Sequence, residues 1–148
     1  MLAKFIIAFL VAGFLAISGP SEDPVIAKSK IWAGISIEKP VFVWKEETKF
    51  LPMHFALIND GDETIDPRLR SCELLVNGRV PKNWEQTINN GPRDKRWRAL
   101  PPGDVLHLTI AFEEEFRKPG VYKVMWKGKE FKSAEIEFRV VTEEKAPN

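Results

Sequence analysis

Few residues in this chain could carry chemistry, and their spacing does not suit a catalytic arrangement. The only histidines are His54 and His107, and the only cysteine is Cys72. A zinc site needs three or four ligands, and a hydrolytic histidine needs a nucleophile and an orienting group. Ser71 and Ser133 have no nucleophile motif around them. We therefore predict a protein that is not an enzyme and holds no metal or other cofactor, with histidines that face solvent or pair.

Two other polar features have structural interpretations. Glu113–Glu115 is a run of three acids on a connecting segment. A calcium site needs oxygens that converge from a shaped loop, so we predict a solvated charge run instead. A lone cysteine cannot form an internal disulfide, and we predict that Cys72 is a small buried hydrophobe on a strand. An intermolecular disulfide and a reactive thiol are the alternatives for Cys72.

The best candidate for a functional site is the basic and aromatic segment 92–98, Pro-Arg-Asp-Lys-Arg-Trp-Arg. Tryptophan and arginine are enriched at binding hot spots, because they bury a large area and make directional polar contacts. We predict a partner-binding site formed by Trp84, Arg96, Trp97 and Arg98. On a strand, Trp97 would point away from the two arginines, so the alternative is that Trp97 belongs to the core. Trp84 is either part of the same aromatic patch or a cap on one end of the domain.

The first 18 residues have the order of a secretory signal peptide. Lys4 precedes the uncharged run 5–17, Ala16 and Ser18 form a small-x-small cleavage signal, and the chain then turns polar. We expect cleavage after Ser18, a flexible lead-in over 19–30, and a periplasmic or secreted location. The alternative is an uncleaved membrane anchor, although a spanning helix needs about 20 apolar residues.

Cleavage would leave 130 of the 148 residues, which suits one domain. Removal of Lys4 changes 22 basic and 21 acidic residues to 21 of each, so the mature net charge is zero. A balanced charge gives no overall field that attracts nucleic acid or an anionic membrane. We therefore expect no nucleic-acid partner and no stable membrane insertion after cleavage.

Most of the chain alternates apolar and polar residues with the period of two that is typical of strands. Six segments have one apolar face, and a short edge piece is expected as well: 31–37, 51–57, 70–76, 106–112, 120–126 and 134–140, with the edge piece at 41–44. Asn77-Gly78 predicts a hairpin with a return strand from Val80. Residues 81–96 are predicted as a long loop without an amphipathic helix. Seven or eight short strands predict an all-β, two-sheet antiparallel sandwich over 31–142, with a polar tail over 143–148.

Three local patterns narrow this fold class. They are Phe-Ala-Leu-Ile-Asn-Asp-Gly at 55–61, Leu-Pro-Pro-Gly-Asp at 100–104 and Pro-Gly-Val-Tyr-Lys-Val at 119–124. Together they resemble bacterial immunoglobulin-like domains, and their spacing over 31–141 is similar to the bacterial proteinase-inhibitor type. The resemblance implies an immunoglobulin-like β-sandwich in which the hydroxyl of Tyr122 bonds back to upstream backbone as a tyrosine corner. The acidic residue that the family usually has four positions before this tyrosine is Lys118 here.

These observations lead to one function hypothesis and two alternatives. We expect an exported, non-catalytic binding or accessory module that recognises another envelope or secreted protein through loops at one end of the sandwich. The resemblance implies the first alternative, an inhibitor of an extracellular protease that presents a loop such as 83–92 to the cleft of the enzyme. The second alternative is a glycan or small-ligand binder that uses exposed tryptophans.

Overall fold

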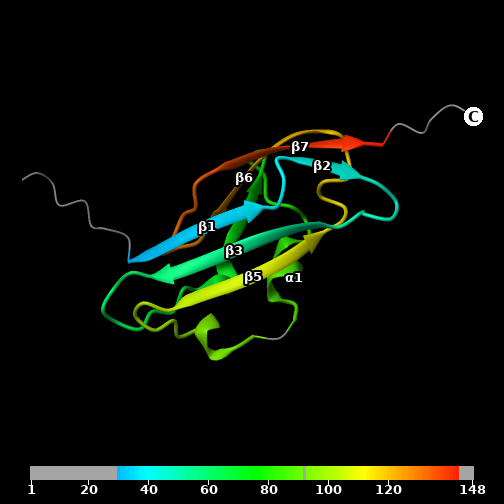
Figure 1. Ribbon diagram of the computed structural model, residues 1–148. Helices are drawn as coiled ribbons and strands as arrows, with labels where there is room; N and C mark the ends of the chain where they lie inside the picture. Colours follow the sequence, from blue (N-terminus) through cyan, green and yellow to red (C-terminus); the bar gives the residue numbers. More distant parts are fainter. Residues whose placement is uncertain (1–29, 92, 144–148) are drawn as a thin grey trace, which may run out of the picture.

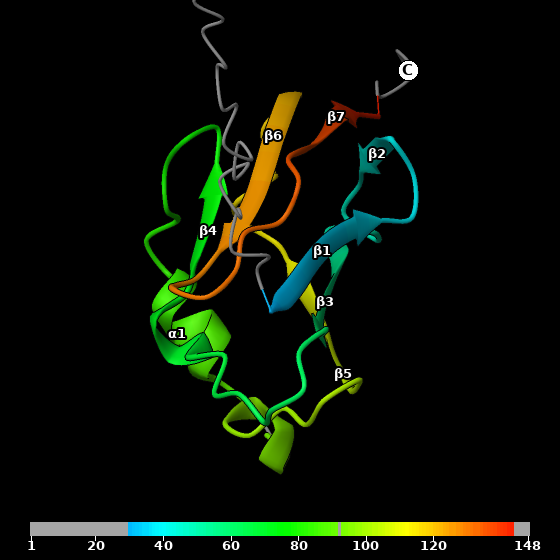
Figure 2. The same ribbon diagram turned by 90° about the vertical axis from the view of Figure 1, so that its left-hand side faces the viewer.

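The chain folds into two packed β-sheets in a computed structural model, which describes residues 30–91 and 93–143 (Figure 1). The three-stranded sheet has the order β1-β3-β5 and the four-stranded sheet has the order β2-β7-β6-β4. The strands are β1 Ile31–Ile37, β2 Val41–Trp44, β3 Leu51–Asn59, β4 Glu73–Val76, β5 Val105–Phe112, β6 Gly120–Lys127 and β7 Ile136–Thr142. The predicted all-β sandwich is confirmed, and Figure 2 shows its two layers from the side.

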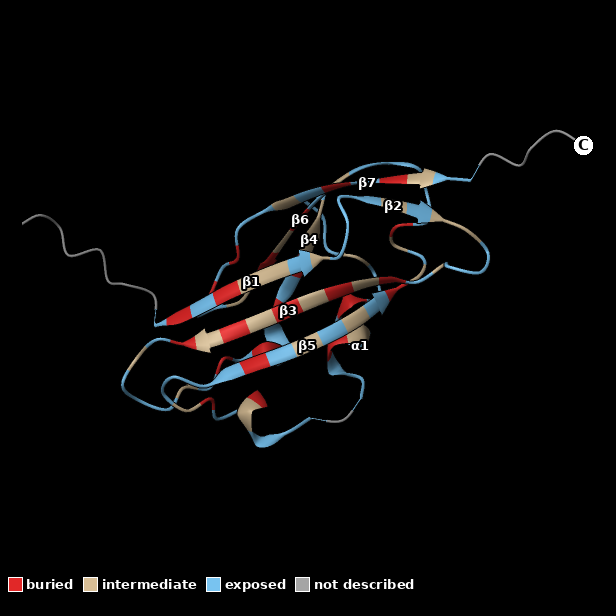
Figure 3. Ribbon diagram, viewed as in Figure 1, coloured by how far each residue is buried: buried red, intermediate tan, exposed pale blue. Residues whose placement is uncertain are grey.

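Alternation along each strand places the core between the sheets. In the central strand β3, every second residue from Leu51 to Leu57 is buried, which appears as the red bands in Figure 3. The ring of Phe55 meets the edge of Trp126 from the other sheet, with 5.1 Å between ring centroids. Burial of large apolar and aromatic side chains is the dominant favourable contribution to folding here, because Cys72 is free and no disulfide restrains the described chain.

One strand pair departs from the antiparallel arrangement that we predicted. β2 runs parallel to β7, with Val41 opposite Arg139. After β1 the chain breaks at Pro40 and crosses to the edge of the other sheet, where Pro40 O accepts a hydrogen bond from the N–H of Arg139 at 2.9 Å. Because β1 and β2 follow each other without reversing direction, β2 meets its new neighbour in parallel.

The segment after β3 differs from the prediction in two places. The strand predicted over 70–76 begins only at Glu73, because Leu69–Ser71 forms the 3-10 turn η1. Asn77 and Gly78 form the expected turn, with φ of 48° and 78°. The predicted return strand from Val80 is wrong, since pairing stops at one bridge between Val76 and Arg79. Pro81 follows at once and has no N–H to donate to a ladder.

The prediction that 81–96 is a loop without a helix is also wrong. Helix α1, Trp84–Asn89, lies within it and buries Trp84 and Ile88 on one face. The spacing of four between these two apolar residues is the helical signal. Six residues give too few periods for that signal to stand out from the surrounding polar sequence. The helix closes one side of the sandwich, next to β4 (Figure 2).

Cys72 is buried, as predicted, although it precedes β4 instead of lying within it. The indole Nε1 of Trp126 donates to its Sγ at 3.2 Å, and Nε1 of Trp84 donates to its backbone carbonyl at 2.7 Å. Burial raises the pKa of the thiol from 9.0 to about 11. The thiolate that reacts with oxidants and disulfides is therefore disfavoured in the folded protein.

This shift predicts that stability falls as the pH rises from about 9 to about 11, by about 2–3 kcal/mol from Cys72 alone. In that window the unfolded chain has lost the thiol proton and the folded chain still holds it. Urea unfolding across this range should give a shallower pH slope for Cys72→Ala than for the wild type. Burial also raises the pKa of Tyr122, but this residue is present in both proteins and does not affect the comparison. Equal slopes would contradict the prediction.

Candidate functional site

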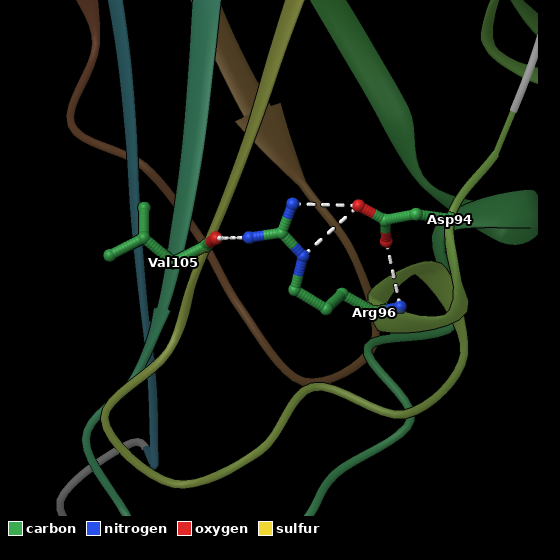
Figure 4. Close-up of polar contacts among 3 residues, drawn as sticks. All are labelled: Asp94, Arg96 and Val105. Carbon is green, nitrogen blue, oxygen red and sulfur yellow. Dashed lines mark hydrogen bonds and ion pairs between the residues drawn. The ribbon is translucent and has the colours of Figure 1, made fainter.

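The basic segment of the predicted site forms a second 3-10 turn, η2, Lys95–Trp97. Asp94 begins the turn, and its carboxylate accepts a hydrogen bond from the backbone N–H of Arg96 at 2.8 Å. The guanidinium of Arg96 bonds the same carboxylate through Nε at 3.0 Å and Nη2 at 2.7 Å, and Nη1 donates to Val105 O at 2.8 Å (Figure 4). The hydrogen bonds between the two side chains lower the pKa of Asp94 and raise the pKa of Arg96. Arg96 therefore fastens η2 to the start of β5.

Trp97 lies in the core, with only 4% of its surface exposed. The guanidinium carbon of Arg93 stands 4.1 Å from the centre of its ring, a cation–π contact. Arg93 also donates hydrogen bonds to the carbonyls of Ile88 and Asn90, at the end of α1. Partial burial lowers the pKa of Arg93. The stack of Trp97 and Arg93 thus holds the end of the helix against η2.

Trp84 is a core residue as well, with 2% of its surface exposed. Its ring packs against Phe55 and Phe112, with centroid distances of 6.1 and 6.4 Å. The structure therefore offers neither Trp84 nor Trp97 as an exposed aromatic surface. Contact of these two rings with a partner is still a prediction, and the burial of both rings argues against it.

Arg98 follows η2 and remains exposed, at the junction of two neighbouring recesses. The first, about 600 Å³, lies between α1 and η2 and is lined by Glu85, Asn89, Arg93, Asp94 and Lys95 besides three shared residues. The second, about 510 Å³, is lined by Asp66, Arg68, Leu69 and Ser71 besides the same three, which are Arg70, Trp97 and Arg98. We call the two recesses together the basic cleft.

Arg68 and Arg70 also line this cleft, although they belong to a segment that precedes α1 in the sequence. Arg68 has a left-handed backbone, φ 53° and ψ 43°, just before η1. The carboxylate of Asp66 accepts a hydrogen bond from its N–H at 2.8 Å, which stabilises this uncommon conformation. The 3-10 turn that follows ends the segment beside α1, so that two loops far apart in the chain place arginines on one surface.

The charges around the cleft are unbalanced. Arg68, Arg70, Lys95 and Arg98 form no ion pair within residues 30–91 and 93–143, and we call them the cleft cations. Of the three carboxylates in the lining, Asp94 is already paired with Arg96. Some lysines elsewhere are paired with acids on neighbouring strands, as in the Lys127–Glu73 pair at 3.0 Å. The arrangement suits a ligand that brings negative charge, because arginine binds carboxylates in a geometry-specific way.

The other residues that could carry chemistry have structural partners. His54 and His107 stack with 5.8 Å between ring centroids on the outer face of the three-stranded sheet, so the predicted pairing is confirmed. The hydroxyl of Ser71 donates to Arg68 O, and that of Ser133 donates to Ala134 O. No three His, Cys, Asp or Glu side chains gather as metal ligands in the described part of the chain. Two acids of the run 113–115 make exposed ion pairs, Glu113 with Lys49 and Glu114 with Arg117.

Tyr122 donates a hydrogen bond from its hydroxyl to Lys118 O at 2.7 Å. Its ring packs on Phe116 and Phe138, with centroid distances of 5.1 and 5.7 Å. The acceptor is a backbone carbonyl, so the bond does not depend on the side chain at position 118. It closes the connection that leads from β5 into β6.

Sequence analysis found one wall of the cleft and missed the other. It singled out Arg96 and Arg98, but it did not select Arg68, Arg70 or Lys95 for the site. The available signal was the density of arginines in two polar segments, 68–70 and 93–98, which nothing in the sequence links. The backbone bridge between Ile65 and Leu100 and the packing of η1 against α1 bring the two segments together.

The structure thus defines a small all-β sandwich with a basic cleft beside α1 and η2. No protein-family model and no curated protein sequence matches the chain. Across the described residues, no helix is long and apolar enough to span a membrane. The predicted signal peptide and nearly all of the lead-in fall within residues 1–29, outside the described residues.

Proposed function

We propose that this protein is an exported, non-catalytic binding module, and that its basic cleft recognises an acidic segment of another envelope or secreted protein. The observation that carries this proposal is the group of four cleft cations without an ion-pair partner among the described residues. Hydrogen bonds to the carboxylates of Asp66 and Asp94 hold the backbones of the two turns that carry these residues, which limits the entropy lost on binding. Of the four residues predicted from the sequence to bind a partner, Arg98 is the best candidate. Trp84 and Trp97 are buried, and Arg96 is bound to Asp94.

The protease-inhibitor alternative rests on the resemblance to bacterial proteinase-inhibitor domains. Its candidate loop, 83–92, contains α1 with Trp84 and Ile88 buried, so most of this segment is not an exposed extended loop. The glycan alternative has one supporting residue in the described chain, Trp32, which is 57% exposed on β1. Neither alternative accounts for the cleft cations.

The proposal predicts that Arg70→Glu/Arg98→Glu loses the natural partner. Residues 19–148 with a tag, crosslinked in the native organism, serve as bait, and the captured protein is then titrated in purified form. We expect affinity to fall about 10- to 100-fold, because two charge-assisted contacts become repulsive. Binding by the wild type should also weaken with added salt.

Lys39→Glu/Lys129→Glu is the matched control, because it changes the net charge equally on exposed residues outside the cleft. This control should bind like the wild type. Equal binding by the cleft variant and the wild type would overturn the proposal. A protease whose activity the protein inhibits would favour the inhibitor alternative instead.

A further inference from the structure

The outer edge of β5 has the properties of an unprotected strand edge. β5 ends the order of the three-stranded sheet, is eight residues long, and has no charged residue, proline or glycine. Proteins usually shorten, charge, bulge or cover such an edge, because its free N–H and C=O groups can pair with another chain. The edges of the other sheet follow this rule, since β2 and β4 have only four residues each.

The register shows which backbone groups of β5 face outward. The N–H of Asn59 donates to Asp104 O at 3.2 Å, directly before β5. Bonded pairs alternate in an antiparallel ladder, so Leu106, Leu108 and Ile110 bond to β3. The outward N–H and C=O groups therefore belong to the residues between them: His107, Thr109 and Ala111. The hydrogen bond from Arg96 to Val105 O, the preceding outward carbonyl, agrees with this assignment.

A recess runs along this part of the edge. It has a volume of about 580 Å³ and is lined on one side by the continuous run 107–111 of β5. The end of α1 and the residues after it, including Ile88, Asn90 and Arg93, form the other side. Because consecutive residues line the recess, and not every second one, the backbone edge itself faces it. Arg93 also lines the first recess of the basic cleft, so the recess along β5 and the basic cleft share one lining residue.

We propose that an extended acidic peptide segment of the partner adds as a fourth strand to the edge of β5, with its carboxylates reaching the basic cleft past Arg93. This inference rests on the proposed function and specifies the conformation of the segment. Backbone hydrogen bonds to His107, Thr109 and Ala111 supply affinity, as in other cases of strand addition, and the cleft cations select for acidic side chains. Strand addition explains why a recess with a bare backbone edge lies next to unpaired arginines.

The test uses a fluorescein-labelled peptide of five Glu-Val repeats, titrated against residues 19–148 and followed by fluorescence anisotropy. A second peptide is N-methylated at its two central residues, so that neither of its edges can pair fully. We expect the N-methylated peptide to bind at least about tenfold more weakly, because backbone hydrogen bonds are lost. In the unmodified complex, amide exchange at His107, Thr109 and Ala111 should slow.

Thr109→Pro tests the same edge from the side of the protein. Proline is tolerated on an edge strand where its position faces away from the ladder, and it removes the outward N–H. Thr109→Val keeps that N–H and is the matched control. We expect Thr109→Pro to lose at least about tenfold in affinity and Thr109→Val to bind like the wild type. If Thr109→Pro does not fold, the pair of peptides on the wild-type protein still decides the question.

The outcomes separate the two proposals. Equal binding of the methylated and unmodified peptides, with loss in Arg70→Glu/Arg98→Glu, would overturn strand addition and leave the basic cleft as the binding site. Loss through N-methylation without any effect of the cleft variant would overturn the acidic selection. No binding of either peptide at about 1 mM would count against both proposals.

Discussion

Replacing Asn59 with alanine is expected to lower the free energy of unfolding by about 3 kcal/mol. This side chain is fully buried at the end of β3. Its Nδ2 donates to Glu63 O at 2.7 Å and to Leu100 O at 2.9 Å, and its Oδ1 accepts from the N–H of Gly61 at 3.0 Å. Alanine would remove the hydrogen bonds that the side chain makes to Glu63 O and to the N–H of Gly61, and would leave Leu100 O with only the N–H of Ile65. Each buried polar group left unsatisfied costs about 1–3 kcal/mol.

Urea unfolding of Asn59→Ala measures this loss directly, and thermal unfolding should show a shift of roughly 10 °C. Asn90→Ala is the control, because this asparagine is exposed and its side chain has no hydrogen bond within the described chain. We expect a change within about 0.5 kcal/mol for the control. A loss below about 1 kcal/mol for Asn59→Ala would contradict this prediction and show that water replaces the hydrogen bonds of the deleted amide.

Asn59 also shows what the sequence can and cannot reveal about this fold. The Asn-Asp-Gly sequence at 59–61 is typical of a turn that follows a strand, and the structure ends β3 at Asn59. The alternation of apolar residues identified β3 and β5 almost to their boundaries, because one face of β3 is buried over its full length and one face of β5 is buried or half-buried. Nothing local indicated that Asn59 also bonds Leu100, since that contact spans 41 residues.

The elements that sequence analysis missed are short or depend on distant partners. α1 has six residues, so its pattern of Trp84 and Ile88 is too brief to distinguish from chance.

The roles of the arginines beside the cleft also could not be predicted from the sequence. Arg96 and Arg98 are neighbours in sequence with the same side-chain chemistry, yet the carbonyl of Val105 engages Arg96 while Arg98 stays exposed. The Pro-Pro-Gly-Asp sequence at 101–104 is typical of a turn before a strand, but the role of Arg96 is visible only in the three-dimensional contact.

Arg96 has a positioning role in the proposed site. It links η2 to the start of β5 through its bonds to Asp94 and Val105. Its guanidinium already donates a hydrogen bond to the outward carbonyl of Val105, so an added strand can pair with β5 only from His107 onward. The two proposed recognition surfaces share Arg93, which lines both the basic cleft and the recess along β5.

Replacing Trp97 with alanine is expected to have the largest effect on stability, a loss of about 4 kcal/mol. The ring is almost fully buried, and Arg93 lies 4.1 Å above its centre while holding the carbonyls at the end of α1. Alanine would leave a cavity and remove the support of that guanidinium. For a domain with a typical stability of about 5–15 kcal/mol, this loss brings the folded state near its limit.

Trp97→Phe is the matched variant, because it keeps an aromatic face under Arg93 and should cost only about 1–2 kcal/mol. Urea unfolding followed by far-ultraviolet circular dichroism measures both variants without relying on tryptophan fluorescence. The ring positions one wall of the basic cleft, so we expect the binding of an acidic partner to follow stability across the series. If Trp97→Ala instead keeps wild-type stability and loses only partner binding, Trp97 contacts the partner itself, and the core assignment of its ring is wrong.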